Sequence, residues 1–275
     1  MKLYLTHERS PAFSSTVIPA ALAKCSLAGM TAVCLICFAM LMPSVASAQP
    51  SQLPPQFVRL REVAPAIRQD IRYAGAFNFT GKRVPGYEAA ECILLRDVAA
   101  ALARVQARLV ADGFHLKVYD CYRPALAVLS FIDWAQSAEP DTMGPVFSPR
   151  IPKAQQFALG YLAKRSKHSL GTAVDLGMVR AGDPDLPSPT RAGPCDGPFS
   201  VRAKESSLDF GTAYDCASVL SATRVPGVTA QARANRDRLV RAMAAEGFRN
   251  YAKEWWHFEF SGPTAPLRTH DFVVR

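Results

Sequence analysis

The chain has 275 residues, and 49% of them are hydrophobic, which is enough for a globular core. Its formal net charge is +9, from 32 basic and 23 acidic residues, but the basic residues are scattered and form no long run. The sequence therefore predicts no nucleic acid partner, and a general attraction to an anionic cell envelope is the milder consequence of the charge.

The N-terminal region has the pattern of an export signal. Residues 27–42 form an uncharged apolar run, preceded by Lys24 and followed by Ala46-Ser47-Ala48, which predicts a signal peptide over 1–48. A membrane anchor is the alternative, but this run is shorter than the roughly 20 residues that span a bilayer. We expect an exported, periplasmic protein whose mature part, 49–275, keeps no stable membrane span.

Four cysteines follow the predicted signal: Cys92, Cys121, Cys195 and Cys216. An even number in an exported chain indicates disulfides, and four cysteines allow three connectivities. We favour Cys92–Cys121 and Cys195–Cys216, because each pair brackets a local unit of the chain. The spacings are not those of a zinc site built from cysteines.

The first half of the mature chain predicts two helices around a strand. Apolar residues recur at three- and four-residue steps over 94–109, which indicates an amphipathic helix ending near Gly113. Residues 116–122 alternate like a strand. Pro124 then opens a second helix that runs to about Gln136, with proline in its permitted first turn.

The second half repeats this mixture. Residues 177–207 are rich in proline and glycine, which predicts a long inserted loop, and 233–246 reads as a helix followed by a strand over 251–260. Helices and strands in mixed order predict one α+β domain, with a mainly antiparallel central sheet flanked by helices.

A first group of candidate site residues surrounds a predicted strand over 172–176. Ala173 and Asp175 share one face of this strand, and Gly171 permits a tight turn that brings His168 back over Asp175. The alternative is a buried histidine at a turn and an aspartate at a strand end. For this segment alone, that alternative would be preferred.

A second group contains Glu254 and His257. On a regular strand these side chains point to opposite faces, so both serve one site only if Glu254 lies on the preceding loop or a bulge intervenes. The alternative is a tryptophan-rich core strand with an exposed glutamate. Taken with His168 and Asp175, the two segments supply three zinc ligands, a free position for water, and a carboxylate to take its proton.

Arg123 lies between the predicted strand and helix in Asp120-Cys-Tyr-Arg-Pro124. A fixed guanidinium at such a joint suits a substrate carboxylate or the oxyanion of a tetrahedral intermediate. The alternative is a surface arginine paired with an acid.

Together these motifs resemble a known family. Ser-x-His-x-x-Gly-x-Ala-x-Asp at 166–175 and Glu-x-Trp-His at 254–257 resemble the zinc-dependent D-alanyl-D-alanine dipeptidases, which share the hedgehog-type fold of the D,D-peptidases. The resemblance covers about 63–260, nearly the whole mature chain. It includes four further fragments: Arg72-Tyr73-Ala74, Asn78-Phe-Thr-Gly81, Gly86-Tyr87-Glu88 and Tyr122-Arg123-Pro124.

The resemblance implies a role for each matching residue in the chemistry. One Zn²⁺ per chain would be held by His168, Asp175 and His257. Glu254 would act as general base, and Arg123 would stabilise the oxyanion. The implied reaction is hydrolysis of the dipeptide D-Ala-D-Ala to free D-alanine.

The resemblance also implies a substrate pocket. Tyr73, Tyr87 and Ser166 would shape it, and Asp215 matches the acid that receives the ammonium group of the dipeptide, although the inserted loop precedes this position. The alternatives are a D,D- or L,D-carboxypeptidase that trims peptidoglycan stem peptides, a non-catalytic zinc-stabilised binding module, and a nonspecific basic envelope protein.

Overall fold

The computed structural model describes residues 53–264 and 266–275, so the predicted signal peptide over 1–48 lies outside the described residues. In this part of the chain, none of the helices combines the length and apolar character needed to cross a bilayer.

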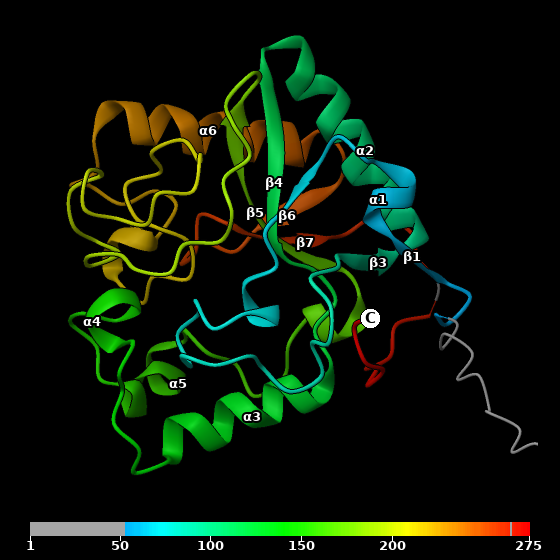
Figure 1. Ribbon diagram of the computed structural model, residues 1–275. Coiled ribbons are helices and arrows are strands. Elements are labelled where there is room, and N and C mark those ends of the chain that lie inside the picture. Colours follow the sequence, from blue (N-terminus) through cyan, green and yellow to red (C-terminus); the bar gives the residue numbers. More distant parts are fainter. Residues whose placement is uncertain (1–52, 265) are drawn as a thin grey trace, which may run out of the picture. The chain divides into compact units, whose positions relative to one another are not determined.

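The centre of the described chain is a five-stranded sheet in the order β2-β4-β5-β7-β6 (Figure 1). Strand β2 pairs with β4 in parallel, and the other three pairings are antiparallel, so the sheet is mixed. A separate antiparallel pair is formed by β1 and β3. The strands are β1 Phe57–Arg59, β2 Arg68–Gln69, β3 Ile93–Leu95, β4 Phe114–Asp120, β5 Ala173–Arg180, β6 Phe248–Asn250 and β7 His257–Phe260. The predicted α+β class is confirmed.

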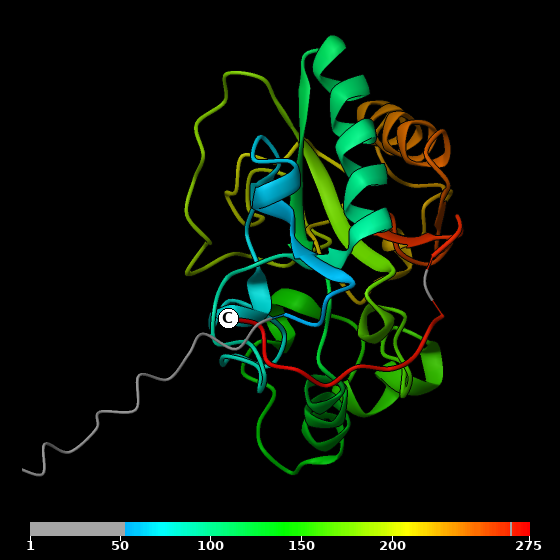
Figure 2. The same ribbon diagram turned by 90° about the vertical axis from the view of Figure 1, so that its right-hand side faces the viewer.

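Helices α2 and α6 lie side by side against one face of this sheet (Figure 2). The apolar side chains of α2 that recur every three or four residues are all buried, which is why this segment forms a helix here. Beyond the end of the sheet where β4 finishes lie α3, α4 and α5 (Figure 1). The helices are α1 Leu60–Val63, α2 Arg96–Ala111, α3 Ala125–Gln136, α4 Gly144–Phe147, α5 Gln156–Leu159 and α6 Ala230–Ala244, with 3-10 turns at Arg72–Ala74, Lys153–Gln155, His168–Leu170 and Val219–Ser221.

The prediction of one strand over 251–260 was wrong in one respect, because the segment consists of a loop followed by a strand. Strand β6 ends at Asn250, and β7 begins only at His257. The amide of Asn250 donates hydrogen bonds to the carbonyl oxygens of Glu254 and His257, both at 3.0 Å, and so closes the loop between the strands. This loop carries Glu254.

Both favoured disulfides, Cys92–Cys121 and Cys195–Cys216, are confirmed. The first ties the residue before β3 to the residue that follows β4, close to Arg123. The second joins the long segment after β5 to the residue beside Asp215. In the chain-entropy model, closing loops of 29 and 21 residues stabilises the fold by about 3 kcal/mol each.

The long segment after β5 is fastened to the sheet by buried charges. Strand β5 continues to Arg180, so the first residues of the predicted 177–207 loop are strand, and residues 181–207 contain no regular helix or strand. Lys117 of β4 donates to the carbonyl oxygen of Glu205 at 2.6 Å and contacts the Asp70 carboxylate at 2.9 Å. Arg72 contacts the carboxylates of both Asp70 and Glu205. These charges are buried but paired, as buried charges must be.

Candidate active site

Strand pairing alone gathers three of the polar residues of the site. Asp175 is the third residue of β5, and it lies opposite His257 of β7 on one side and Asp120 of β4 on the other. Directly opposite residues on neighbouring strands place their side chains within contact distance on one face. The register of the sheet therefore forms a row of two carboxylates and one imidazole.

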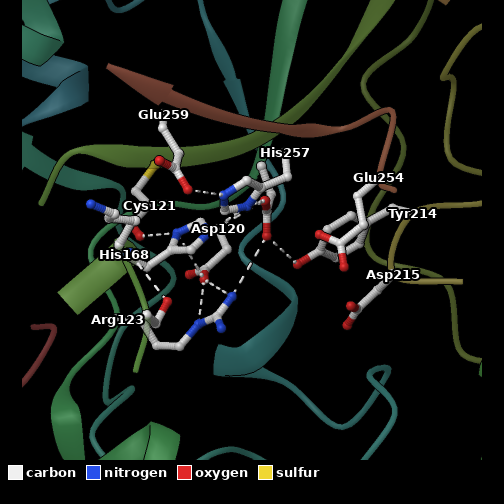
Figure 3. A network of polar contacts seen from close by, with 12 residues as sticks. Asp120, Cys121, Arg123, His168, Tyr214, Asp215, Glu254, His257 and Glu259 are labelled. Atoms are coloured by element: carbon white, nitrogen blue, oxygen red, sulfur yellow. Dashed lines mark hydrogen bonds and ion pairs between the residues drawn. The ribbon is translucent and has the colours of Figure 1, made fainter. Parts of the chain in front are cut away.

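His168 joins this row from the turn before β5. The turn His168–Leu170 ends at Gly171, whose φ of 75° is the left-handed conformation that glycine adopts without strain. A Cβ atom at this position would lie 2.4 Å from the Phe57 ring, so the close approach also requires glycine. The predicted turn is present, and it brings His168 Nε2 to 3.3 Å from Asp175 Oδ1 (Figure 3).

The donor atoms of His168, Asp175 and His257 form a compact triangle. His257 Nδ1 lies 2.9 Å from Asp175 Oδ1 and 3.1 Å from His168 Nε2. Tetrahedral zinc with bonds of 2.0–2.1 Å separates neighbouring nitrogen or oxygen ligands by about 3.3 Å, so the triangle needs little adjustment to hold this ion. Two imidazoles and one carboxylate are also a catalytic zinc ligand set. The residues fit a zinc ion.

The second nitrogen of each imidazole is also engaged. His168 Nδ1 lies 2.6 Å from the carbonyl oxygen of Cys121, which fixes Nδ1 as the donor and leaves Nε2 as the free lone pair. His257 Nε2 lies 3.6 Å from Glu259. Such partners orient metal-binding imidazoles. Burial alone would raise the pKa of Asp175, but the two imidazoles outweigh it and hold that pKa well below its ordinary value.

Glu254 lies on the loop before β7, the placement that the sequence required for it to share a site with His257. Its side chain lines the same cavity as the three donors. Burial, reinforced by the negative charges of Asp175 and Asp215, raises the pKa of Glu254 to about 8. A raised pKa increases the proton affinity of the ionised carboxylate, which is a property that a general base needs.

Arg123 lies in the connection between β4 and α3, as predicted, and is fixed by a carboxylate that the sequence interpretation did not assign to the site. Its Nε and Nη2 atoms lie 2.9 Å and 2.8 Å from Asp120 Oδ2. Its Nη2 atom also lies 3.6 Å from Asp175 Oδ2. The guanidinium stacks over the Tyr73 ring at 5.1 Å. Arg123 is therefore held rigidly at the wall of the cavity.

The cavity has a volume of about 230 Å³ and is lined by Tyr73, Ser166 and Asp215, in addition to the residues already described. Tyr73 donates a hydrogen bond of 2.9 Å to Asp215. Burial, followed by the charge of Asp175, raises the pKa of Asp215 to about 7. Of the four predicted substrate residues, Tyr87 is the one that does not line this cavity. It is buried, and its hydroxyl donates to Asp120 at 2.6 Å.

Asp120, Tyr214 and Glu259 are among the polar residues of this site that sequence interpretation missed. Asp120 carried a usable signal, because it stands three residues before Arg123 and within the predicted strand over 116–122. Tyr214 carried none: its hydroxyl donates to Asp175 Oδ2 at 3.3 Å, across a contact between segments far apart in the chain. In Figure 3, Tyr214 lies on the side of Glu254 and Asp215, and Arg123 lies on the side of Asp120 and His168.

A His-Asp-His triangle with a free carboxylate and a fixed arginine in one cavity defines the class of metal-dependent hydrolases. Comparison with known proteins narrows this class. The sequence model of the Peptidase_M15 family, described as D-ala-D-ala dipeptidase, matches residues 54–188 and 198–275. The chain belongs to this family of metallopeptidases, and the membership agrees with the hedgehog-type fold that the resemblance implied.

Individual relatives agree with the family match. A D-alanyl-D-alanine dipeptidase of Streptomyces coelicolor is 34% identical over 79% of this chain and 98% of its own length. A protein of the same name from Enterococcus faecium is 29% identical over 80% of this chain and 98% of its own length. One from Escherichia coli is 29% identical over 79% of this chain and 91% of its own length.

Proposed function

We propose that this protein is a zinc-dependent dipeptidase that hydrolyses D-Ala-D-Ala to two molecules of D-alanine. The proposal is carried by one observation: the triangle of His168, Asp175 and His257 lies in a cavity that Glu254 and Arg123 also line. The substrate is inferred from the names of the relatives. Zinc is inferred from the donor set of two imidazoles and one carboxylate.

In the proposed mechanism His168, Asp175 and His257 hold one zinc ion. When bound, zinc would supply a Lewis acid that lowers the pKa of a water molecule towards about 7. Glu254 accepts the proton of the attacking water and later delivers it to the departing amine. Arg123 donates hydrogen bonds to the oxyanion that develops on the peptide carbonyl.

Two further carboxylates have different roles in the proposal: one positions Arg123, and the other binds the substrate. Asp120 acts as a positioning residue, because it fixes the Arg123 guanidinium and accepts the hydrogen bond of Tyr87. Asp215 receives the ammonium group of the dipeptide. Its raised pKa means that ionisation is less favourable in this pocket than in water, and an incoming cation would favour the ionised form.

This assignment of Asp215 distinguishes the dipeptidase from a carboxypeptidase acting on longer stem peptides. A longer peptide places an uncharged amide where the dipeptide has its ammonium, so the buried ion pair with Asp215 does not form, and only the dipeptide gains the free energy of this pair. We therefore expect kcat/KM for D-Ala-D-Ala to exceed that for N-acetyl-D-Ala-D-Ala by at least about a hundredfold, measured as released D-alanine with zinc-loaded protein.

The matched variant for this test is Asp215→Asn, which keeps the size of the side chain and removes its charge. We expect it to lose most of the discrimination between the two substrates. Faster hydrolysis of the acetylated substrate by the unaltered protein would favour the carboxypeptidase reading. A non-catalytic binding module would hydrolyse neither substrate.

We also propose that residues 49–275 form one zinc dipeptidase domain, exported to the periplasm after removal of residues 1–48. The two disulfides support this proposal, since disulfides persist mainly in oxidising compartments.

A further inference from the structure

Asp215 has a backbone conformation that glycine adopts far more readily than other residues. Its φ is 62°, in the left-handed region, and Ser206 is the one other non-glycine residue of the described chain with a positive φ. Aspartate tolerates this region better than most residues, but the conformation persists only where the surrounding structure enforces it. The contacts on either side of Asp215 therefore determine where its side chain points.

Cys195 holds the chain on both sides of Asp215. Its carbonyl oxygen accepts a hydrogen bond of 2.9 Å from the backbone amide of Ala213, and its Sγ atom forms the disulfide to Cys216. The two points of attachment lie two residues before Asp215 and one residue after it. One residue of the long segment after β5 therefore closes a short ring that contains Asp215.

This ring is anchored to α4 and buried. Cys195 and Cys216 are 1% and 0% exposed. The backbone amide of Cys195 donates to the carbonyl oxygen of Val146 at 2.8 Å, and the amide of Ala217 donates to that of Phe147, also at 2.8 Å. Since Val146 and Phe147 belong to α4, the disulfide fastens the segment that carries Asp215 to this helix.

The carboxylate of Asp215 has few polar contacts of its own. Its Oδ2 atom accepts the hydrogen bond of 2.9 Å from Tyr73, and this is its one side-chain hydrogen bond within the described residues. The position of the carboxylate therefore depends mainly on the backbone of 213–216. A displacement of about 1 Å in a group that orients the substrate can lower the rate by about a hundredfold.

Cys195 lies in a part of the chain that the family match leaves out. The Peptidase_M15 match covers 54–188 and 198–275, so residues 189–197 fall between its two parts. Asp215 and Cys216 lie within the second part. The disulfide therefore joins a residue outside the family match to the residue that follows Asp215.

We propose that the Cys195–Cys216 disulfide determines substrate specificity by positioning the Asp215 carboxylate to receive the ammonium group of the dipeptide. The inference rests on the proposed function, because it acts through the role of Asp215 given there. Cys195 and Cys216 are positioning residues and do not touch the substrate. A disulfide that only stabilised the fold would raise the unfolding temperature and leave the discrimination between substrates unchanged.

The experiment removes the disulfide in Cys195→Ala/Cys216→Ala and compares D-Ala-D-Ala with N-acetyl-D-Ala-D-Ala. We expect KM for D-Ala-D-Ala to rise by about tenfold or more, with kcat within about threefold of the unaltered value. The kcat/KM for the acetylated substrate should change by less than about threefold, so the preference for the free dipeptide falls. Zinc content and thermal unfolding are measured on the same preparation, and the kinetics are recorded where the variant is folded.

Cys92→Ala/Cys121→Ala is the matched control. This disulfide closes a loop of 29 residues, against 21 for Cys195–Cys216, so its removal should lower the unfolding temperature by a comparable amount. The carbonyl oxygen of Cys121 contacts His168 Nδ1, on the metal-binding side of the site. Any loss of turnover in this variant should affect both substrates equally, and the preference for the free dipeptide should stay.

A double-mutant cycle tests whether the disulfide acts through Asp215. Asp215→Asn removes the charge that the disulfide is proposed to position. In this background, removing Cys195–Cys216 should change kcat/KM for D-Ala-D-Ala by less than about threefold, because the two changes affect one interaction. Effects that multiply as independent changes would overturn the proposal.

The remaining outcomes separate this inference from the function on which it rests. An unchanged preference in folded, zinc-containing Cys195→Ala/Cys216→Ala would overturn the inference alone. Cys195→Ala/Cys216→Val refills more of the volume and is used if the first variant does not fold; if neither folds, the disulfide serves the fold as a whole and the inference is overturned. If the unaltered protein hydrolyses neither substrate, or Asp215→Asn keeps the full preference, the proposed function itself fails at that point and the inference fails with it.

Discussion

Glu254→Gln should give a folded, zinc-containing protein that hydrolyses D-Ala-D-Ala at least about a hundredfold more slowly than the unaltered protein. Glutamine preserves the shape of the side chain but accepts no proton at neutral pH. The loss should appear in kcat, because proton transfer occurs in the transition state rather than on binding. Turnover, zinc content and thermal unfolding would be measured on the same preparation.

Glu62→Gln is a suitable control for this variant, since Glu62 lies on α1 and its side chain is 58% exposed. It should retain full turnover. If Glu254→Gln kept more than a tenth of the unaltered turnover with zinc bound, Glu254 would not be the general base.

Arg123→Ala should lower kcat by about a hundredfold to a thousandfold, which is the usual effect of removing one preorganised oxyanion donor. This variant should still fold and keep its zinc, because Arg123 contributes no ligand to the His-Asp-His triangle. Kinetics with D-Ala-D-Ala and metal analysis of the purified variant test both parts of the prediction. Turnover within tenfold of the unaltered protein would remove Arg123 from the mechanism.

A second effect of this substitution must be separated from catalysis. Arg123 neutralises Asp120, whose side chain is fully buried, and removing one partner of a buried pair typically destabilises a protein by about 3–5 kcal/mol. Asp120→Asn combined with Arg123→Ala removes the unpaired charge. We expect the double variant to recover thermal stability but not turnover.

The sequence predicted the helices well, because their signals are local. The apolar period over 94–109 corresponds to α2 at Arg96–Ala111, and Pro124 stands directly before α3. The helix predicted over 233–246 begins earlier, at Ala230, where the Thr229 side chain accepts a hydrogen bond from the Ala232 backbone. A cap of this kind is a local signal that was available but not used.

The parts of the site that follow from the spacing of residues along the chain could be predicted. The parts that depend on strand register or tertiary packing could not. The turn at Gly171 and the loop position of Glu254 could be inferred from residue order. The row of Asp120, Asp175 and His257 depends on the register of three strands, which no local pattern specifies. The contact of Tyr214 with Asp175, and the cavity itself, arise from tertiary packing alone.

The central claim is that one zinc ion is held by His168, Asp175 and His257. The most direct measurement is anomalous X-ray diffraction at the zinc edge from crystals of the purified protein, with metal content determined on the same sample. We predict one zinc per chain and a single anomalous peak between the three donor atoms, and neither in His257→Ala. Protein that hydrolyses D-Ala-D-Ala without stoichiometric metal, or with its anomalous peak elsewhere, would contradict this assignment.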